Sequence, residues 1–248
     1  MFVYFAEKLN FLESSMKKYF LVFLGLLFNV SLYAQTPLDT YDSNETLSSD
    51  KCYDVIKAVW DGLKKISEEY TSQEAVKSEF ETTAEFHERL RKAKDQFINN
   101  VNKFFRDNKL DERIYSVWLK AELVKYDADN QVYSVKSPTQ ILVQPKKDDI
   151  AVTVASNKYA SIVEKNQDGY RRANFQLSTD PDFSWFVNKQ TAQAAKGKEG
   201  QIYFKLWFRF NVYVNEPGDQ IVIQIVPSKL ALMDQQESFT YWSEDIVR

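Results

Sequence analysis

Three residue types that build many functional sites are scarce in this chain of 248 residues, which has one cysteine, one histidine and six glycines. Cys52 lacks a second cysteine for an internal disulfide, so we expect a buried thiol, with an intermolecular disulfide as the alternative. His87 alone excludes a metal site built on paired histidines, and no zinc ligand set can be assembled. Loops that cradle phosphate need several glycines, and the one close pair, Gly197 and Gly200, predicts a flexible connection. We therefore expect no metal and no cofactor.

An excess of positive charge is also lacking, because 32 basic residues stand against 35 acidic ones and the formal net charge is −3. Nucleic-acid binding needs a clustered basic face that displaces counterions from phosphates. The chain offers only isolated basic doublets such as Lys146-Lys147 and Arg171-Arg172. The composition therefore predicts no nucleic-acid partner.

The clearest feature that is present is an export signal. Met16-Lys17-Lys18 leads into the apolar run Tyr19–Phe28, and Ala34-Gln35 supplies a small residue at the expected cut. A membrane span needs about 20 apolar residues, so a cleaved signal is favoured over a retained anchor. We predict a signal peptide over residues 1–34, with the true start at Met16, and a periplasmic or secreted protein. Since Gln35 stands where a bacterial lipoprotein has cysteine, we expect no stable membrane anchor after cleavage.

After a flexible polar linker, residues 35–49, the sequence predicts a single α+β domain over residues 50–248 that begins with a helical hairpin. From Asp50 to Tyr70, apolar residues recur at steps of three and four. A second helix starts at Thr82, which can form a capping box with Glu85, and ends at Asp107-Asn108. The apolar positions are Cys52, Val55, Ile56, Val59, Leu63, Ile66 and Tyr70 in the first helix, and Phe86, Leu90, Ala93, Phe97, Val101 and Phe104 in the second.

Most of the remaining chain alternates with a period of two, which is typical of strands. The fold class is predicted to be α+β, with the N-terminal helical hairpin packed on a mostly antiparallel sheet of about six strands and one further short helix. Asp180-Pro181 is expected to start that helix, which runs to residue 195. Strands are predicted as hairpin pairs at residues 115–124 with 132–136 and 202–214 with 220–226, and singly at 139–144, 150–155 and 170–178, with a turn at 166–169.

One segment resembles a phrase in exported bacterial proteins of unassigned function. It is Phe80-Glu81-Thr82-Thr83-Ala84-Glu85-Phe86, followed by Arg89. In those proteins too a helix precedes strands with an aromatic-Asp-Ala-Asp turn, similar to Tyr126-Asp127-Ala128-Asp129 here. The motif is a helix start, so the resemblance implies lineage and stability, and it brings no catalytic residues.

No pattern in the sequence singles out a catalytic site. His87 lies off the apolar stripe of its helix and is expected at the surface, without a glycine-flanked serine to act on. The segment Asp127–Asn130 fits a hairpin turn, because Val132 and Pro138 stand where an EF-hand loop needs glycine and glutamate. The adjacent carboxylates Glu68-Glu69 point to different sides of a helix, unlike a glycosidase pair. A non-enzymatic protein is therefore expected more than an enzyme.

Aromatic side chains on polar strand faces are the one feature that suggests a binding surface. Trp118 falls on the polar side of its strand, and Tyr203, Trp207 and Tyr213 share a strand face with Arg209. Exposed aromatics on a sheet can stack on sugars or anchor a protein, whereas cover on both faces would make them a second core. We predict first a non-enzymatic periplasmic domain that binds a protein or a cell-envelope component such as a glycan. The alternatives are a carbohydrate-binding module that uses these aromatics and a hydrolase of unrecognised type.

Overall fold

The structure, a computed structural model, describes residues 38, 45–72, 76–145, 149–167, 170–177, 183–216 and 219–246. The predicted signal peptide lies outside the described residues, as do Asp168 and Gly169 of the predicted turn and the start of the predicted short helix at residues 180–182. The chain divides into two compact units, residues 1–40 and 41–248, and the elements described below belong to the second.

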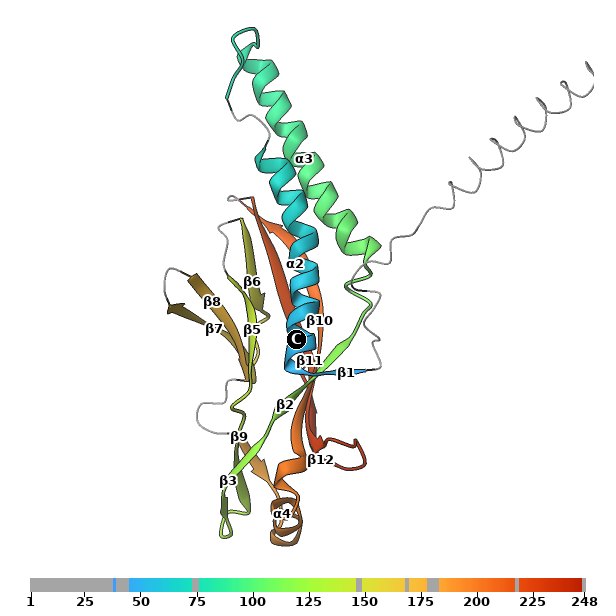
Figure 1. The fold of residues 1–248 in the computed structure, drawn as a ribbon, viewed down its shortest axis with the longest axis vertical. Coiled ribbons are helices and arrows are strands. Elements are labelled where there is room, and N and C mark those ends of the chain that lie inside the picture. Colours follow the sequence, from blue (N-terminus) through green and yellow to red (C-terminus); the bar gives the residue numbers. More distant parts are fainter. Residues whose placement is uncertain are drawn as a thin grey trace, which may run out of the picture. The chain divides into compact units, whose positions relative to one another are not determined.

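Two long helices form the predicted hairpin, α2 (Ser49–Thr71) and α3 (Thr83–Asp107). The Thr82 hydroxyl accepts a hydrogen bond from the Glu85 amide at 3.2 Å, and the Glu85 carboxylate accepts one from the Thr82 amide at 2.8 Å. The predicted capping box is therefore confirmed. Asn108 ends α3, as predicted. The two helices run side by side (Figure 1), and they approach closely where Gly62 of α2 faces the Phe104 ring of α3.

A mixed six-stranded sheet, which we call sheet A, packs against this hairpin. Its strands follow the order β1-β2-β10-β11-β12, and β6 pairs with β11. The pairs β1–β2 and β6–β11 are parallel, and the other pairs are antiparallel. The strands of sheet A are β1 (Thr46–Leu47), β2 (Tyr115–Lys120), β6 (Ile150–Val154), β10 (Ile202–Asn215), β11 (Gln220–Asp234) and β12 (Thr240–Asp245).

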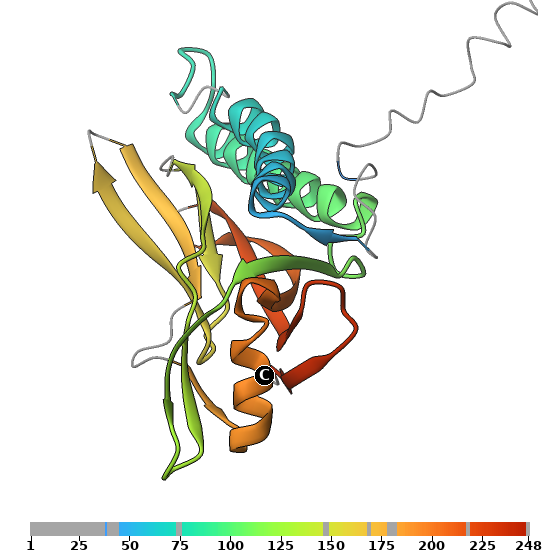
Figure 2. The same cartoon turned by 60° about the horizontal axis from the view of Figure 1, so that its bottom comes forward.

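Two three-stranded antiparallel sheets complete the unit, sheet B with the order β3-β4-β9 and sheet C with the order β5-β8-β7. A short helix, α4, lies at the opposite end from the tip of the hairpin (Figures 1 and 2). The predicted α+β class is thus confirmed. The remaining elements are β3 (Glu122–Asp127), β4 (Val132–Lys136), β5 (Gln140–Pro145), β7 (Ala160–Gln167), β8 (Tyr170–Leu177), β9 (Phe183–Phe186), α4 (Lys189–Lys196) and the 3₁₀ turn η2 (Glu199–Gln201).

The short helix predicted over residues 180–195 starts later than expected. Residues 183–186 form strand β9, and α4 begins at Lys189 with the Asn188 side chain as its cap. Phe183 and Trp185 point into the core, while Ser184 and Phe186 face solvent, so the segment has the period of a strand and pairs with β4. Pairing with a distant strand outweighs the local helix signal of Asp180-Pro181.

Other strand boundaries also differ from the prediction. The predicted strand over residues 115–124 is divided at buried Ala121, because the chain leaves sheet A as β2 and enters sheet B as β3. Thr46 and Leu47, in the predicted linker, pair with β2, and the Leu47 side chain is fully buried. Strands β7 and β12 were not predicted, because each contains few apolar residues and neither shows a clear alternation of apolar residues.

The core lies between α2 and one face of sheet A. Along β10, the side chains that point to this face are buried, including Phe204, Leu206 and Phe208. Cys52 of α2 lines a small cavity together with Val117 and Phe208, and burial raises the pKa of its thiol to about 12. The expected buried thiol is confirmed. Each fully buried large apolar side chain contributes about 1.5–3 kcal/mol to folding. Burial of this face therefore holds β10 in place, and it thereby fixes the positions of the side chains on the other face of sheet A.

Candidate ligand-binding site

The aromatic residues predicted as a binding surface lie on the face of sheet A that points away from α2. Alternation along β10 places Tyr203, Trp207, Arg209 and Tyr213 on this face, and Trp118 projects from the neighbouring strand β2. Trp118, Tyr203 and Trp207 are half-buried, while Arg209 is exposed and Tyr213 is 38% exposed. All five side chains therefore reach the surface of the described unit, although to different degrees.

A buried lysine separates the two tryptophans. The Lys205 ammonium lies 5.4 Å from the Trp118 ring centroid and 4.9 Å from that of Trp207. It also donates to Glu237 at 2.7 Å, and its side chain is only 7% exposed. A second ammonium, from Lys229, lies 5.4 Å from the Trp207 ring centroid. Because two cations already lie over its ring, Trp207 has little free aromatic surface for a ligand.

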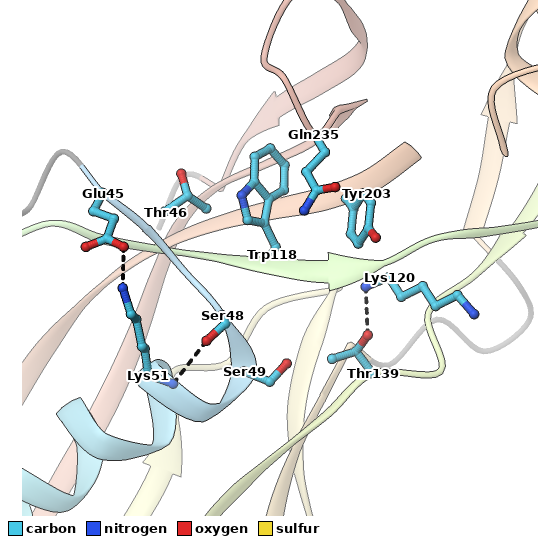
Figure 3. Close-up of a pocket in the computed structure, with 10 residues that line it drawn as sticks. All are labelled: Glu45, Thr46, Ser48, Ser49, Lys51, Trp118, Lys120, Thr139, Tyr203 and Gln235. Atoms are coloured by element: carbon cyan, nitrogen blue, oxygen red, sulfur yellow. Dashed lines mark hydrogen bonds and ion pairs between the residues drawn. The ribbon is translucent and has the colours of Figure 1, made fainter. Parts of the chain in front are cut away.

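Trp118 and Tyr203 belong instead to a pocket of about 560 Å³ (Figure 3). Their rings meet edge to face, with centroids 6.0 Å apart and planes at 66°. The pocket lies where β1 leads into α2, so that residues far apart in the sequence meet there. Its walls are formed by Glu45, Thr46, Ser48, Ser49, Lys51, Trp118, Lys120, Thr139, Tyr203 and Gln235.

Charges in this pocket are paired within the protein. Lys51 forms an ion pair with Glu45, and Lys120 lies 3.5 Å from Glu122. The Thr139 hydroxyl accepts a hydrogen bond from the Lys120 amide at 2.7 Å. With these groups engaged, the pocket presents mainly uncharged hydrogen-bonding groups beside its aromatic pair.

Three of these uncharged groups are available to a ligand. The side-chain polar atoms of Ser49, Tyr203 and Gln235 have no hydrogen-bond partner within the described part of the chain. The Thr46 hydroxyl, in contrast, donates to Glu237 at 3.1 Å and accepts from Ser116 at 3.2 Å. The pocket therefore combines fixed polar groups with unengaged ones, beside an aromatic wall.

The described residues of the pocket do not include a pair of carboxylates. Two carboxylates about 5–10 Å apart are needed in most glycosidases. Among the described residues that line the pocket, Glu45 is the one acid, and its carboxylate is paired with Lys51. His87 is exposed on α3 beside Phe86, at 5.5 Å between ring centroids, and is not a residue of this pocket.

A second groove, of about 420 Å³, follows the surface of α3 and contains two glutamates. The pKa of Glu85 is lowered by hydrogen bonds from Thr82. The pKa of Glu88 is lowered to about 2, first by a hydrogen bond from Arg91. A general acid needs a raised pKa, which neither carboxylate has. Glu85 instead caps α3, and Glu88 forms an ion pair with Arg91 on the same helix.

Asp127, Asp129 and Asn130, which the sequence compares with a calcium-binding loop, form a hydrogen-bonded turn. The Asp127 carboxylate accepts hydrogen bonds from the amides of Asp129 and Asn130, at 3.0 and 3.1 Å, and its pKa is lowered, first by the side-chain hydrogen bond from Asn130. Among the described residues, no cluster of three or more histidine, cysteine, aspartate or glutamate side chains is placed to hold a metal ion.

The fold and the pocket define an α+β protein with a polar pocket walled by an aromatic pair. Comparison of the chain with protein families, curated proteins and solved structures found no match. Within the described ranges, no helix is long and apolar enough to cross a bilayer.

Sequence reasoning identified Trp118 and Tyr203 but missed the other pocket residues. Thr139 and Gln235 lie in loops after β4 and β11, and nothing in their local sequence marks them. The sequence does mark Ser48 as a helix N-cap, because serine is typical directly before an apolar helical stripe. In the structure its hydroxyl accepts a hydrogen bond from the Lys51 amide at 3.3 Å. That these residues line one pocket, however, depends on how the fold brings the loops after β4 and β11 close to the start of α2.

Proposed function

We propose that this chain is an exported, non-enzymatic binding domain whose pocket receives a sugar unit of a cell-envelope glycan. The observation that carries the proposal is the pocket itself, which sets the Trp118–Tyr203 pair beside hydroxyl and amide groups while its charges pair internally. The expectation of export comes from the sequence of residues 16–35.

A sugar ring suits this chemistry better than a charged or wholly apolar ligand. Pyranose rings have apolar C–H faces that pack on aromatic side chains, and their hydroxyls need donors and acceptors at the rim. Tyr203 offers both an aromatic ring and a hydroxyl, and Ser49 and Gln235 add further hydrogen-bonding groups. Lys51 and Lys120 already have acidic neighbours, so an anionic ligand would have to compete with Glu45 and Glu122.

The proposed surface is smaller than the row of aromatics expected from the sequence. Trp207 is engaged by Lys205 and Lys229, and neither Arg209 nor Tyr213 is a pocket residue. The proposal therefore assigns ligand contact to Trp118 and Tyr203 and predicts little contribution from Tyr213.

The experiment measures binding of the chain without residues 1–34 to purified insoluble envelope glycan by co-sedimentation. We expect Trp118→Ala and Tyr203→Ala to weaken binding about tenfold or more, as loss of a central aromatic anchor does. Tyr213→Ala, an aromatic truncation on the same sheet face but outside the pocket, should bind like the wild type. Equal binding by all variants, or no binding by the wild type, would refute the proposed function.

A further inference from the structure

The described side chains that line the pocket include no aliphatic hydrophobic residue. Apart from the rings of Trp118 and Tyr203, these side chains end in charges, hydroxyls or an amide. Burial of a methyl group is favourable only against apolar atoms. Since the proposed function assigns the two rings to the C–H faces of a sugar, the described lining has no comparable surface left for the methyl group of an acetylated sugar.

Gln235 supplies the amide group of this lining. Figure 3 shows its side chain reaching between the rings of Trp118 and Tyr203. Neither the oxygen nor the nitrogen of the Gln235 side chain has a hydrogen-bond partner in the described part of the chain. A ligand that stacks on the aromatic pair therefore meets an unengaged donor and an unengaged acceptor on one side chain.

The backbone at Gln235 is held in place, although its side chain is exposed. The Gln235 main-chain amide donates to the Gln201 carbonyl at 2.9 Å. Asp234, the preceding residue, is only 4% exposed, and its carboxylate accepts a hydrogen bond from the Ser238 amide at 2.7 Å. The Asp234 amide in turn donates to the Phe239 carbonyl at 3.1 Å. The point from which the Gln235 side chain reaches a ligand is therefore fixed in advance, which reduces the entropy lost on binding.

A glutamine amide presents an acceptor and a donor side by side in one plane. This arrangement lets glutamine bind the adjacent donor and acceptor on the edge of adenine. Hydroxyls on neighbouring carbons of a sugar ring, at least one of them equatorial, offer a matching pair, because one can donate to Oε1 while the other accepts from Nε2. An acetamido group in place of one hydroxyl breaks the match, since the N–H and C=O of a trans amide point in opposite directions.

We infer that the pocket selects neutral sugar units that carry two adjacent free hydroxyls, and that Gln235 is the residue that determines this specificity. In a glycan linked through O4, a hexose unit keeps adjacent hydroxyls at C2 and C3, whereas an N-acetylhexosamine unit carries its acetamido group at C2. The inference rests on the proposed function and narrows its class of ligand. The charges agree with a neutral unit, because Lys51 and Lys120 both have acidic neighbours.

The experiment uses the exported chain, purified from cells that express the full sequence, in co-sedimentation with insoluble envelope glycan. One portion of the glycan is treated with periodate, which cleaves the bond between two carbons that carry adjacent hydroxyls, and is then reduced with borohydride. Gln235→Met keeps the length of the side chain and removes both hydrogen-bonding groups. Gln236→Met is the matched control, because Gln236 is an exposed glutamine of the same loop outside the described lining of the pocket. Urea unfolding confirms that both variants are folded.

We expect periodate to abolish binding of the wild type. Gln235→Met should weaken binding to untreated glycan about tenfold, because the sugar hydroxyls lose their partners, and Gln236→Met should bind like the wild type. Chitin, an insoluble polymer of N-acetylglucosamine, should not sediment the chain.

Three results would overturn the inference and leave the proposed function standing. They are binding that survives periodate, binding to chitin, and equal binding by the Gln235→Met and Gln236→Met variants. Absence of wild-type binding to untreated glycan would instead refute the proposed function, and the inference with it.

Discussion

At the scale of single residues, Lys205 decides how the aromatic face can be used. Its ammonium is buried between Trp118 and Trp207 and pairs with Glu237, which also accepts from Thr46 at the pocket wall. A buried cation needs such a partner, because an unpaired charge in the interior is costly. Lys205 therefore contacts both rings, and it is the second cation over Trp207, from Lys229, that leaves this ring less available than Trp118.

Removal of the acidic partner should therefore cost more than removal of the lysine. We expect Glu237→Ala to lower the free energy of unfolding by about 1–2 kcal/mol, less than for a fully buried pair because Glu237 is 47% exposed. Lys205→Met removes the charge and keeps the volume, so its cost should be smaller. Urea unfolding of both variants and of the double variant checks this. If the double variant lost as much stability as the two single variants added together, Lys205 and Glu237 would not stabilise each other as a pair.

At the scale of elements, the helical hairpin depends on the absence of a side chain at one position. A Cβ atom at Gly62 would lie 2.3 Å from a ring carbon of Phe104, closer than any ordinary contact. Glycine inside a helix otherwise costs about 0.5–1 kcal/mol relative to alanine. The close approach of α2 and α3 therefore explains a residue that helix propensity alone disfavours.

Gly62→Ala should destabilise the chain although alanine is the better helix former. We expect a loss of about 1–3 kcal/mol, as found for overpacked interiors, measured by urea unfolding. Gly197→Ala is the matched control, because a Cβ there meets no atom closer than 3.5 Å, and it should be neutral or stabilising. Adding Phe104→Leu should recover part of the loss at Gly62, and a stabilising Gly62→Ala would show that the helices are not in this contact.

One carboxylate joins both helices to the turn between β10 and β11. Asp219 accepts a hydrogen bond from the Tyr70 hydroxyl at 2.8 Å and forms an ion pair with Lys94 at 2.9 Å. Burial acts to raise the pKa of Asp219, but the hydrogen bonds from Lys94 and Tyr70 outweigh it, so the pKa is lowered. The charged form is thus the one that stabilises the folded state.

The stabilisation by Asp219 should be lost in acid. The pKa of Asp219 is lower in the folded state than its ordinary value of 3.8. The charged carboxylate therefore stabilises the fold at pH values above 3.8, and this stabilisation is lost as the pH falls through the lowered pKa. We expect Asp219→Asn to be less stable than the wild type by about 1 kcal/mol at pH 6, and the difference to shrink towards pH 3. Urea unfolding across this range tests it, and a difference independent of pH would assign the effect to shape, not charge.

At the scale of the whole molecule, the sequence was informative where structure is local. The capping box of α3 depends on residues within one turn of each other and was predicted correctly. The stripe of α2 was predicted at the buried residues Cys52, Val55, Ile56, Val59 and Leu63, while buried Trp60 and Ser67 were missed. The β10–β11 pair was also predicted, although β11 continues to Asp234. Strands β9 and β12 were missed, because pairing with distant strands and not local pattern determines them.

The pocket residues also fall into those that the sequence predicts and those that it does not. Trp118 and Tyr203 could be predicted, since alternation along a strand places them on the polar face. The sequence could not predict that Trp207 would be separated from Trp118. This separation depends on Lys205, which lies between the two rings only when β2 pairs with β10 in this register. Gln235 and Thr139 join the pocket from separate loops, a juxtaposition that only the complete fold creates.

Sugar binding in the Trp118–Tyr203 pocket is tested most directly by following the indole N–H signals of the five tryptophans by nuclear magnetic resonance. The chain is titrated with soluble oligosaccharides released from the envelope glycan. We expect a progressive shift of the Trp118 signal that Tyr203→Ala abolishes, while the signals of buried Trp60 and Trp185 stay in place. A titration that leaves Trp118 unmoved, or that shifts only Trp207, would contradict the assignment of this pocket as the binding site.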